Sequence, residues 1–572
     1  MAAGERRGSS PAMDLAALAL FFGAAAAAFF VPLFAGPTDM PGFTDTLFNM
    51  YVLEHVTRWL AGGVPSLASP GFYWPYPFTF AFSDTHLLSL PFYALPRWIG
   101  LSPESAFKVW FVAGYSLTFI AAHIAMRLMG LRPWPASLGA FAFVFSLPAL
   151  AQILHAQLGW AAGVPFAFLF MLRYAGPQGR PSDLLAFTAA IALQIVLNIY
   201  LGFYALLLCA ILFCCALAFD HGWKPRMWGS RLAGVYRDFR RPRGTGPGLA
   251  AFALLSVLCA VALLGFHGYV AVLYGFGRDW SDIAPMVPRW QSYLMMDALP
   301  YWEPISRRLP DVPARHEHQL FIGLPLGALF LLSFTGLARA PREKILLALT
   351  APVALLLFLS VAGFSLYFLV AQLPGFNAIR AATRYELVAL FPICVVAMLT
   401  LQGLSDRSRL GPVLMLAAAI WVISDVALFK RDEYDSSAER ARIRQISADI
   451  VANGIGPRSV LAYGKGEPLD QRTHRQMLAM WAAMEAGVPT LNGYSGNYPP
   501  GGGNDNCSWF IHQLARYDIW ARENGRPRLA ELGYDIVPLR LPPCDLTPES
   551  VLARDAADLP ASLLDRDGIV SP

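Results

Sequence analysis

The sequence predicts an α-helical polytopic membrane protein that carries a small α/β domain at its C-terminal end. Apolar residues make up 56% of the 572 residues and charged residues only 15%, whereas soluble domains carry about 25% charged residues. The mean hydropathy is +0.45, and the apolar residues come in blocks of about twenty, the length that crosses about 30 Å of hydrocarbon. This composition excludes a soluble enzyme, a disordered scaffold and a disulfide-framework protein.

Eleven such blocks predict about eleven transmembrane helices within a membrane domain that covers residues 1–429. The predicted spans are 13–35, 106–127, 135–151, 157–172, 184–199, 203–219, 248–272, 319–337, 345–362, 385–404 and 411–429. The first apolar run is too long for the core of a typical signal peptide, so we expect a retained anchor. The fifth and sixth spans could also be one helix interrupted at 198–202, which would reverse the membrane orientation of every later segment.

The distribution of basic residues predicts the orientation of the chain. If the N-terminus is cytoplasmic, the cytoplasmic segments contain eighteen Lys and Arg residues, seven of them between 224 and 243. Cytoplasmic loops of membrane proteins are enriched in this way. The C-terminal domain then lies outside the cytoplasm. Because the basic residues are spread through connecting segments, the net charge of +5 does not indicate a nucleic-acid partner.

Three segments on the outer side, 36–105, 273–318 and 430–572, are long enough to form structure of their own. The first loop, 36–105, is expected to contain helices at 46–60 and 85–98 that lie along the membrane interface. Residues 430–572 have the composition of a soluble domain, and they predict the extracytoplasmic α/β domain. Its expected elements are strands at 459–463 and 536–541 and a helix at 475–486.

Cys507 and Cys544 are the only cysteines of this C-terminal domain. Outside the cytoplasm they would face an oxidising compartment, so we expect a disulfide bond between them. Two unrelated buried thiols are the alternative.

Polar residues that could carry chemistry gather near the outer ends of the predicted spans. They are Asp39 and Asp45 after the first span, Asp84 and His86 in the first loop, His155 and Gln157 between the third and fourth spans, and Arg380 and Arg384 before the tenth. A carboxylate at this place can take a proton from an acceptor hydroxyl, and arginines can bind a phosphate through paired N–H donors. At a spacing of four, the two arginines would share one helix face.

Each of these residues also has a structural alternative. Asp45 and Asp84 could cap the helices that they precede, and His155 could be satisfied by Gln157. The two arginines could reach toward lipid phosphate as interfacial anchors. The sequence 316–318, His-Glu-His, resembles a metal site only superficially, and we expect these side chains to be solvated.

The C-terminal domain contains one further polar motif, NGYSGN, over residues 492–497. Asn492, Tyr494 and Asn497 have groups that match sugar hydroxyls, and the tyrosine ring offers a flat apolar face. The alternative is a structural turn, in which Gly and Asn are the expected residues.

Several of these strings resemble the GT-C superfamily of integral-membrane glycosyltransferases, which use polyprenyl-phosphate-linked sugars. The run FTDTLFNMYVLEHVTRWL is followed by FYWPYPFTFAFSDTHLLSLPFYAL, LHAQL, LPGFNAIRAATR and PTLNGYSGNYPPG. Together they are similar to a group of large, poorly characterised bacterial membrane proteins allied to that superfamily. The resemblance implies a multi-pass protein of the bacterial inner membrane, in which Asp45, or less readily Asp39, is the catalytic carboxylate.

The resemblance also implies the partners of the protein: a polyprenyl-phosphate-linked sugar, membrane lipid, and a glycan, lipid or protein acceptor. The superfamily's second acidic residue is absent, because Thr44 and Thr46 flank Asp45. No cofactor is therefore certain, and a divalent cation is the only one left open. Two other functions remain as alternatives: a transporter or flippase of a lipid-linked saccharide, and a non-catalytic membrane protein on the same scaffold. Ion-coupled carriers usually place ionisable residues deep in the bilayer, and few occur in these spans.

Overall fold

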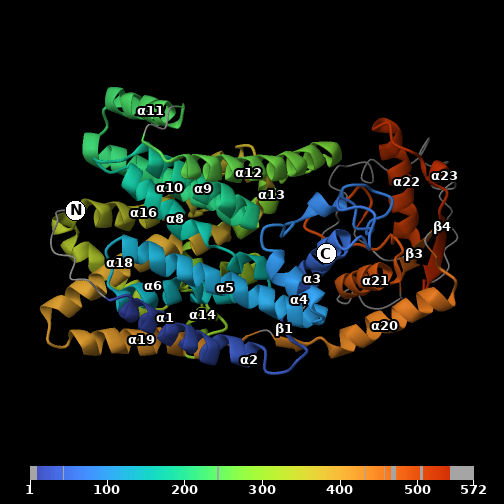
Figure 1. Cartoon of the computed structure of the whole chain (residues 1–572), viewed down its shortest axis with the longest axis horizontal. Helices are drawn as coiled ribbons and strands as arrows, with labels where there is room; N and C mark the ends of the chain where they lie inside the picture. Colours follow the sequence, from blue (N-terminus) through green and yellow to red (C-terminus); the bar gives the residue numbers. More distant parts are fainter. Residues whose placement is uncertain are drawn as a thin grey trace.

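Long helices run side by side along the long axis of the molecule, and shorter helices with a small sheet cover one end of this bundle (Figure 1). The structure is a computed structural model that describes residues 10–541, apart from 43, 241–243, 432, 457, 465–471 and 503–506. For residues 472, 507 and 508 it describes only the backbone.

Each predicted span coincides with an apolar helix. Within the described residues, seven helical segments are long and apolar enough to cross a membrane: Pro11–Leu33, Pro103–Leu128, Pro133–Ala151, Ile199–His221, Pro247–Tyr274, Ala382–Arg407 and Gly411–Leu428. The other four predicted spans are shorter: α8 (Gly163–Tyr174), α9 (Pro181–Leu197), α15 (Leu324–Ser333), continued by a 3₁₀ segment, and α16 (Arg342–Phe358). The predicted class, a helical polytopic membrane protein, is confirmed.

The seven long segments are built from nine labelled α-helices. They are α1 (Pro11–Ala25) and α2 (Val31–Leu33), joined by a π-helical turn, α5 (Pro103–Leu128), α6 (Pro133–Val144), α7 (Leu147–Ala151), α10 (Ile199–His221), α12 (Pro247–Tyr274), α18 (Glu386–Arg407) and α19 (Gly411–Leu428). Local chemistry sets several of their ends. Helix α12 begins with Pro247 at its first position and ends at Gly275, whose φ of +68° suits glycine.

The chain reverses direction between α9 and α10. Asn198 has extended backbone angles, and its side chain accepts a hydrogen bond from Leu201 N–H at 2.9 Å, which caps α10. Gly202 packs against Ile195, because a Cβ at Gly202 would come within 2.5 Å of that side chain. Residues 195 and 202 would be about 10 Å apart along one straight helix. The two helices are therefore separate neighbours, and the interrupted single helix is not observed.

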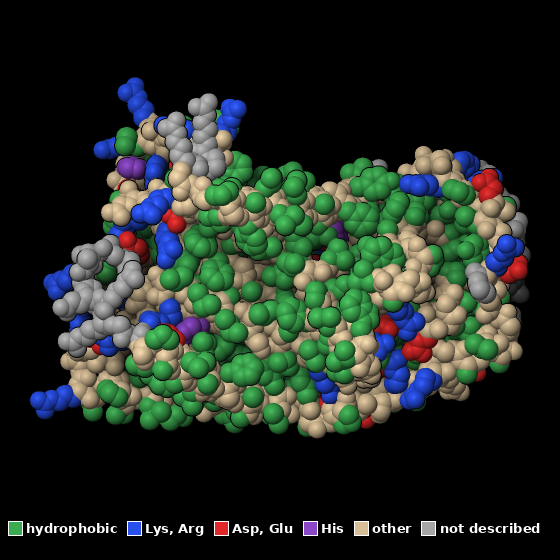
Figure 2. Space-filling view, in the orientation of Figure 1, with side chains coloured by type: hydrophobic (Ala, Val, Ile, Leu, Met, Phe, Trp, Pro, Cys, Tyr) green, Lys and Arg blue, Asp and Glu red, His purple; other side chains and the backbone are tan. Residues whose placement is uncertain are grey.

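Helix α18 lies at the centre of the bundle, where α6, α10, α15, α16 and α19 pack around it. In contrast, α12 and α19 expose most of their apolar side chains. Figure 2 shows apolar side chains over the middle of one face of the molecule, with Lys, Arg, Asp and Glu gathered toward its two ends. This is the pattern expected of a protein whose middle faces hydrocarbon.

The first loop contains the two expected helices, α3 (Thr44–Leu60) and α4 (Pro91–Trp98). Helix α4 begins six residues later than the predicted start at 85. The preceding residues form turns, and His86 has a φ of +53°, a backbone conformation that a helix cannot use. Asp84 therefore does not cap α4.

The chain after the last long helix returns to the first loop. Strand β2 (Glu433–Asp435) pairs antiparallel with β1 (Asp39–Pro41), with Asp39 opposite Asp435. Arg440 then joins three helices, because its guanidinium lies 2.5 Å from Glu104 of α5 and 2.6 Å from Glu485 of α21. Helix α20 (Ser437–Ala452), which carries Arg440, packs on α21 (Arg472–Ala486).

The C-terminal region contains a two-stranded parallel sheet, in which β3 (Ser459–Tyr463) pairs with β4 (Asp535–Leu539). Helices α22 (Cys507–Glu523) and α23 (Leu529–Leu532) precede β4. The predicted strands and helix are thus confirmed, although β4 begins one residue before the predicted strand and ends two residues before its end. The remaining short helices lie in connecting segments: α11 (Pro225–Arg240), α13 (Trp280–Ile283), α14 (Glu303–Ser306) and α17 (Tyr367–Ala371).

Candidate functional site

Five segments that are far apart in sequence meet where the bundle adjoins the C-terminal region. Asp45 lies in the first turn of α3, and His155 lies just after α7. Glu317 belongs to a 3₁₀ turn before α15, and Arg384 to a 3₁₀ turn that leads into α18. Tyr494 comes from the loop after α21. We call these five residues the Asp45 cluster.

Direct contacts link the members of the Asp45 cluster one after another. His155 Nδ1 lies 2.5 Å from Asp45 Oδ2, and His155 Nε2 lies 3.6 Å from Glu317 Oε1. Arg384 donates to both carboxylate oxygens of Glu317, at 2.7 and 3.3 Å. On the other side, the Tyr494 hydroxyl donates to Asp45 Oδ1 at 2.6 Å. Both oxygens of Asp45 therefore contact side chains from distant segments, and Asp45 lies within the first turn of α3 and not before the helix.

Exposure separates the outer members of the cluster from the inner ones. The side chains of Asp45 and His155 are 24% and 22% exposed, whereas that of Glu317 is 3% exposed. Arg384 is 11% exposed, and its guanidinium stacks over the ring of Tyr200, 5.6 Å from the ring centre. Asp45 and His155 can therefore meet a ligand from outside, while Glu317 and Arg384 support them from within.

The cluster favours a charged state in which a histidinium lies between two carboxylates. Burial opposes ionisation of Asp45, but the hydrogen bond and charge of His155 outweigh it and lower the Asp45 pKa. Burial similarly opposes ionisation of Glu317, yet Arg384 and His155 hold its pKa well below the ordinary value. Burial and Arg384 act against a charged His155, but the two carboxylates prevail and raise its pKa. Asp45 is thus an ionised acceptor near neutral pH.

Asp84 lies beside this cluster. Its carboxylate accepts a hydrogen bond from Asn198 Nδ2 at 3.3 Å, at the break between α9 and α10. Burial raises the Asp84 pKa to about 6, although the nearby charges of Arg384 and His155 act in the opposite direction. Asp84 is therefore a second carboxyl group that can exchange a proton near neutral pH.

His86 and Gln157 lie beneath the exposed part of the site and are joined through Asn49 of α3. His86 Nε2 lies 2.9 Å from Asn49 Oδ1, and Asn49 Nδ2 donates to Gln157 Oε1 at 2.8 Å. Burial lowers the His86 pKa to about 3, so its ring is neutral. His86, one of the polar residues that could carry chemistry, is only 3% exposed and supports the helix that carries Asp45. Gln157 bonds to Asn49, and the alternative that it satisfies His155 is not observed.

The two arginines predicted to act as a pair point to different places. Residues 379–381 belong to no helix and separate two short 3₁₀ segments, so Arg380 and Arg384 do not lie on one helix face as predicted. Arg384 is occupied by Glu317, whereas Arg380 is exposed, and its guanidinium makes no hydrogen bond or ion pair with the other described residues. Arg380 remains close enough to Tyr494 to influence it electrostatically.

A second cation, Arg278, reaches the same loop. Its guanidinium donates to Gly496 O at 2.7 Å and to Asn497 Oδ1 at 3.2 Å. Arg278 and Arg380 therefore both approach the NGYSGN loop next to Asp45. Arg278 was not predicted, because it lies more than a hundred residues from Arg380 and in no motif.

The NGYSGN loop is both a structural turn and part of the site. Asn492 is fully buried, and its side chain bonds to both backbone groups of Tyr463 and to Gln476. It therefore positions the loop, contrary to its predicted role as a substrate contact. Asn497 donates to Phe82 O at 3.1 Å, which joins the loop to the first loop. Of the three predicted residues, Tyr494 is the one that reaches Asp45.

Three other predicted residues lie apart from the cluster or outside the described part of the chain. Asp39 belongs to β1, and its carboxylate accepts a hydrogen bond from Gly36 N–H. Among the described residues, no hydrogen bond or ion pair joins Asp39 to the Asp45 cluster. The side chain of Cys507 and all of Cys544 fall outside the described residues, so their disulfide remains a prediction.

The sequence interpretation was wrong about the burial of Glu317. It was expected to be solvated between His316 and His318, but it and His318 are buried. His318 bonds to Ser292 Oγ at 2.7 Å and to Pro285 O at 2.8 Å. Glu317 lies two residues before the predicted span 319–337, and a polar residue near the outer end of a span is also what singled out Asp45.

Within the described residues, no group of three or more His, Cys, Asp and Glu side chains is arranged to hold a metal ion. At the Asp45 cluster, the carboxylates of Asp45 and Glu317 already accept hydrogen bonds from His155, Tyr494 and Arg384. The residues in this arrangement therefore do not fit the divalent cation that the resemblance left open, and no step below uses one.

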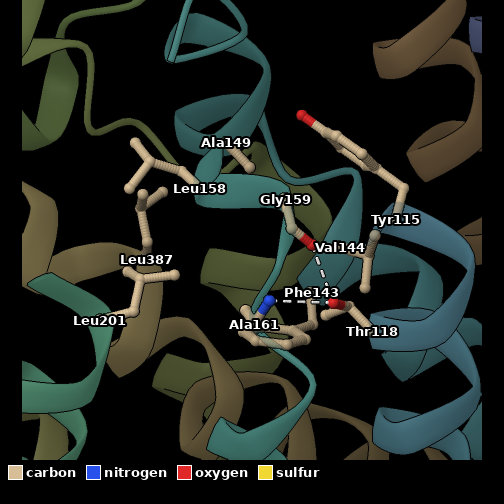
Figure 3. Close-up of a pocket in the computed structure, with 10 residues that line it drawn as sticks. All are labelled: Tyr115, Thr118, Phe143, Val144, Ala149, Leu158, Gly159, Ala161, Leu201 and Leu387. Carbon is tan, nitrogen blue, oxygen red and sulfur yellow. Dashed lines mark hydrogen bonds between the residues drawn. The ribbon is translucent and has the colours of Figure 1, made fainter. Parts of the chain in front are cut away.

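A small cavity lies in the bundle and is lined in part by Leu158, Gly159 and Ala161, which follow His155 in the chain (Figure 3). Its volume is about 30 Å³, and its lining is mainly apolar. Thr118 Oγ1 donates to Gly159 O at 2.8 Å and accepts from Ala161 N–H at 3.0 Å, which fixes the chain that follows His155. Ligand pockets measure about 300–1,000 Å³, so this cavity is a packing feature and holds no sugar.

The fold and the site define a polytopic helical membrane protein with a buried charge cluster at the end of its bundle that adjoins the C-terminal region. No protein-family model matches the chain, and no curated protein matches it in sequence. In fold it is similar to the oligosaccharyltransferase of Archaeoglobus fulgidus in complex with zinc and sulfate. The TM-score is 0.45 at 12% identity, covering 92% of this chain and 67% of that one.

The apo form of the same archaeal protein gives a TM-score of 0.45 at 12% identity, covering 89% of this chain and 68% of that one. The likeness extends over most of the chain but is weak, so the function proposed below rests on the geometry of the site itself.

Proposed function

We propose that this protein is a membrane-embedded glycosyltransferase of the GT-C type. It transfers a sugar from a polyprenyl-phosphate-linked donor to a glycan, lipid or protein acceptor at the extracytoplasmic side of a bacterial inner membrane. The observation that carries the proposal is the environment of Asp45. An ionised carboxylate is held between His155 and Tyr494, and the cations Arg278 and Arg380 approach the NGYSGN loop that carries Tyr494.

In the proposed reaction, Asp45 accepts the proton of an acceptor hydroxyl while the hydroxyl oxygen attacks the anomeric carbon of the donor sugar. The bond between that carbon and the phosphate oxygen breaks, and the polyprenyl phosphate leaves with the electron pair. Arg380 binds the phosphate through charge-assisted hydrogen bonds, and Arg278, which approaches the same loop, adds positive charge. Arg384 lies further inside the site and adds positive charge there, but its guanidinium already forms an ion pair with Glu317.

His155 and Glu317 have supporting roles in this proposal. His155 fixes one oxygen of Asp45 and keeps the carboxylate ionised, which leaves the other oxygen for the acceptor. Glu317 in turn stabilises the protonated form of His155. The Tyr494 hydroxyl occupies the position in which an acceptor hydroxyl would donate to Asp45 Oδ1, so the acceptor takes the place of that hydroxyl.

One observation favours the non-catalytic alternative. Asp45, His155, Glu317 and Arg384 all have partners within the protein, and a closed set of ion pairs would also suit a purely structural role. The experiment must therefore separate loss of the reaction from loss of the fold.

The test compares lipid-linked saccharides and surface glycans in cells that lack the protein and are complemented with one variant at a time. Asp45→Asn keeps the size of the side chain but removes the base, so we expect the product to fall by about 10²-fold or more while the donor accumulates and the protein level stays near normal. Asp311→Asn is the matched control, because Asp311 is 84% exposed on an outer loop.

Full product formation by Asp45→Asn would overturn the assignment. A fall in the amount of folded protein equal to the fall in product would favour the structural role. A glycan profile that does not change when the protein is absent would exclude the proposed reaction altogether.

A further inference from the structure

Helix α11 lies at the end of the bundle opposite the C-terminal helices and stands apart from the other helices (Figure 1). It joins α10, which ends at His221, to α12, which begins at Pro247. Only three residues separate His221 from the start of α11 at Pro225. Since α10 and α12 are both long enough to cross a membrane, α11 is held at the level where the bilayer ends.

One side of α11 is fastened to the bundle. Asp238 Oδ2 accepts a hydrogen bond from the Tyr174 hydroxyl at 3.1 Å, and Arg231 donates to Tyr174 O at 3.4 Å. Val235 packs on the same side against the core. These contacts fix which face of the helix turns away from the protein.

The face that turns away is apolar and unpartnered. Leu232, Tyr236 and Phe239 follow the spacing i, i+4 and i+7, so they form one stripe. They are 54%, 63% and 52% exposed, and no residue of α11 is fully buried. Three exposed arginines, Arg226, Arg237 and Arg240, form a second stripe beside the first, because they are separated by eleven and three residues.

This segment is strongly basic. From Lys224 to Arg240 there are five basic residues and a single acidic one, Asp238, whose carboxylate accepts the hydrogen bond from Tyr174. A helix with an apolar stripe flanked by arginines fits a bilayer surface, where the stripe enters the headgroup boundary and the arginines meet anionic phosphates. An acidic protein partner would satisfy the arginines but would not explain why the helix is fixed at the bilayer level.

We infer that α11 is a docking surface for the anionic lipids of the leaflet that faces this end of the bundle. Leu232, Tyr236 and Phe239 insert into the headgroup region, while Arg226, Arg237 and Arg240 bind lipid phosphates. This surface is independent of the Asp45 cluster, which lies at the opposite end of the bundle, and the inference does not rest on the proposed reaction.

The test measures hydrogen exchange of residues 225–240 in the full-length protein in nanodiscs. One set of discs contains phosphatidylcholine alone, and the other contains about 30% phosphatidylglycerol. We expect the backbone amides of α11 to exchange about tenfold more slowly in the anionic discs, because each basic residue near an anionic surface adds to the attraction. This protection should largely disappear at high salt, which screens the charges.

Arg226→Gln, Arg237→Gln and Arg240→Gln combined should abolish the difference between the two kinds of disc. The matched control combines Arg339→Gln, Arg407→Gln and Arg409→Gln, which removes the same charge from exposed positions in other connecting segments and should leave the difference intact. Equal exchange in both discs for the wild-type protein would overturn the inference. Equal loss of the difference in both triple variants would also overturn it, because general charge and not α11 would then be responsible.

Discussion

The residue with the largest influence on the candidate site is His155, because its two ring nitrogens connect two carboxylates. Its place was predicted from its position in a short outer turn, but its partners were not. The stabilising contributions of His155 and Asp45 depend on pH, because the pKa values of the two groups shift in opposite directions. The raised His155 pKa means that its stabilising contribution is complete below the ordinary value of 6.5 and is lost as the pH rises through the raised value. The lowered Asp45 pKa means that its contribution is present above 3.8 and is lost as the pH falls through the lowered value.

We therefore predict that His155→Gln lowers the apparent melting temperature of the detergent-solubilised protein most strongly between about pH 4 and pH 6.5. The difference from wild type should shrink as the pH rises above the His155 pKa, because the wild-type protein then loses the imidazolium charge as well. His316→Gln is the control for removal of an imidazole, since His316 is exposed one residue before Glu317, and it should lower the melting temperature less than His155→Gln does. A His155→Gln effect that is constant from pH 4 to pH 9 would contradict the charged arrangement.

A second prediction at this scale concerns Tyr494. If an acceptor must displace the Tyr494 hydroxyl from Asp45, Tyr494→Phe removes that competition. Hydrogen bonds to charged groups contribute about 1.5–3 kcal/mol, so the KM for the acceptor should fall by about tenfold or more while kcat stays within about twofold. Tyr498→Phe, four residues along the same loop, is the comparison. A rise in KM would show that Tyr494 binds the acceptor instead of making way for it.

At the scale of the element, the NGYSGN loop shows why a glycine is needed at one position. The first loop and the C-terminal region join here through the backbone, with Tyr73 N–H donating to Asn492 O at 3.1 Å and Trp74 N–H to Thr490 O at 2.9 Å. Gly493 lies directly against the ring of Tyr73, and a Cβ there would come within 2.2 Å of a ring carbon. The loop can carry Tyr494 to Asp45 only because this position has no side chain.

We predict that Gly493→Ala destabilises the contact between the loop and Tyr73, by about 1–3 kcal/mol as for other overpacked sites. Limited proteolysis should cleave the 490–500 segment faster in this variant, and transfer activity should fall with it. Gly456→Ala provides the control, because a Cβ at Gly456 would meet nothing within 4 Å. Equal proteolysis of the two variants would show that the close approach to Tyr73 is not required.

At the scale of the whole molecule, the candidate site exists because the membrane bundle and the C-terminal region share it. Pairing of β1 with β2 fastens the two regions beside the first loop. Trp481 of α21 donates to Leu47 O of α3 at 3.1 Å, which joins them again close to Asp45. The C-terminal region therefore cannot act as an independent module, since it supplies one of the two partners of the candidate base.

At this scale we predict how the molecule is oriented in the membrane, with the C-terminal region outside the cytoplasm. Alkaline phosphatase fused after residue 541 should be active, because it folds with disulfides only outside the cytoplasm. The same reporter fused within the connection between α11 and α12, at residue 244, should be inactive, as the basic residues there predict. The opposite pattern would place the Asp45 cluster on the cytoplasmic side and exclude a reaction outside the cytoplasm.

The sequence by itself determined the membrane class, the positions of all eleven apolar helices, and two strands and one helix of the C-terminal domain. These features follow from apolar length, proline and glycine at helix ends, and alternation in strands, all of which are local in the chain. It also identified Asp45, Asp84 and His155, because polar residues at the outer ends of apolar helices stand out against their surroundings.

Only the tertiary structure decided which of these residues meet. Glu317 is buried beneath His155, Arg384 turns inward to Glu317 while Arg380 faces outward, and Tyr494 arrives from about 450 residues along the chain. None of these relations has a local cause. A charge pair between distant segments depends on how the helices pack, and packing is a property of the whole bundle that no spacing within one segment records.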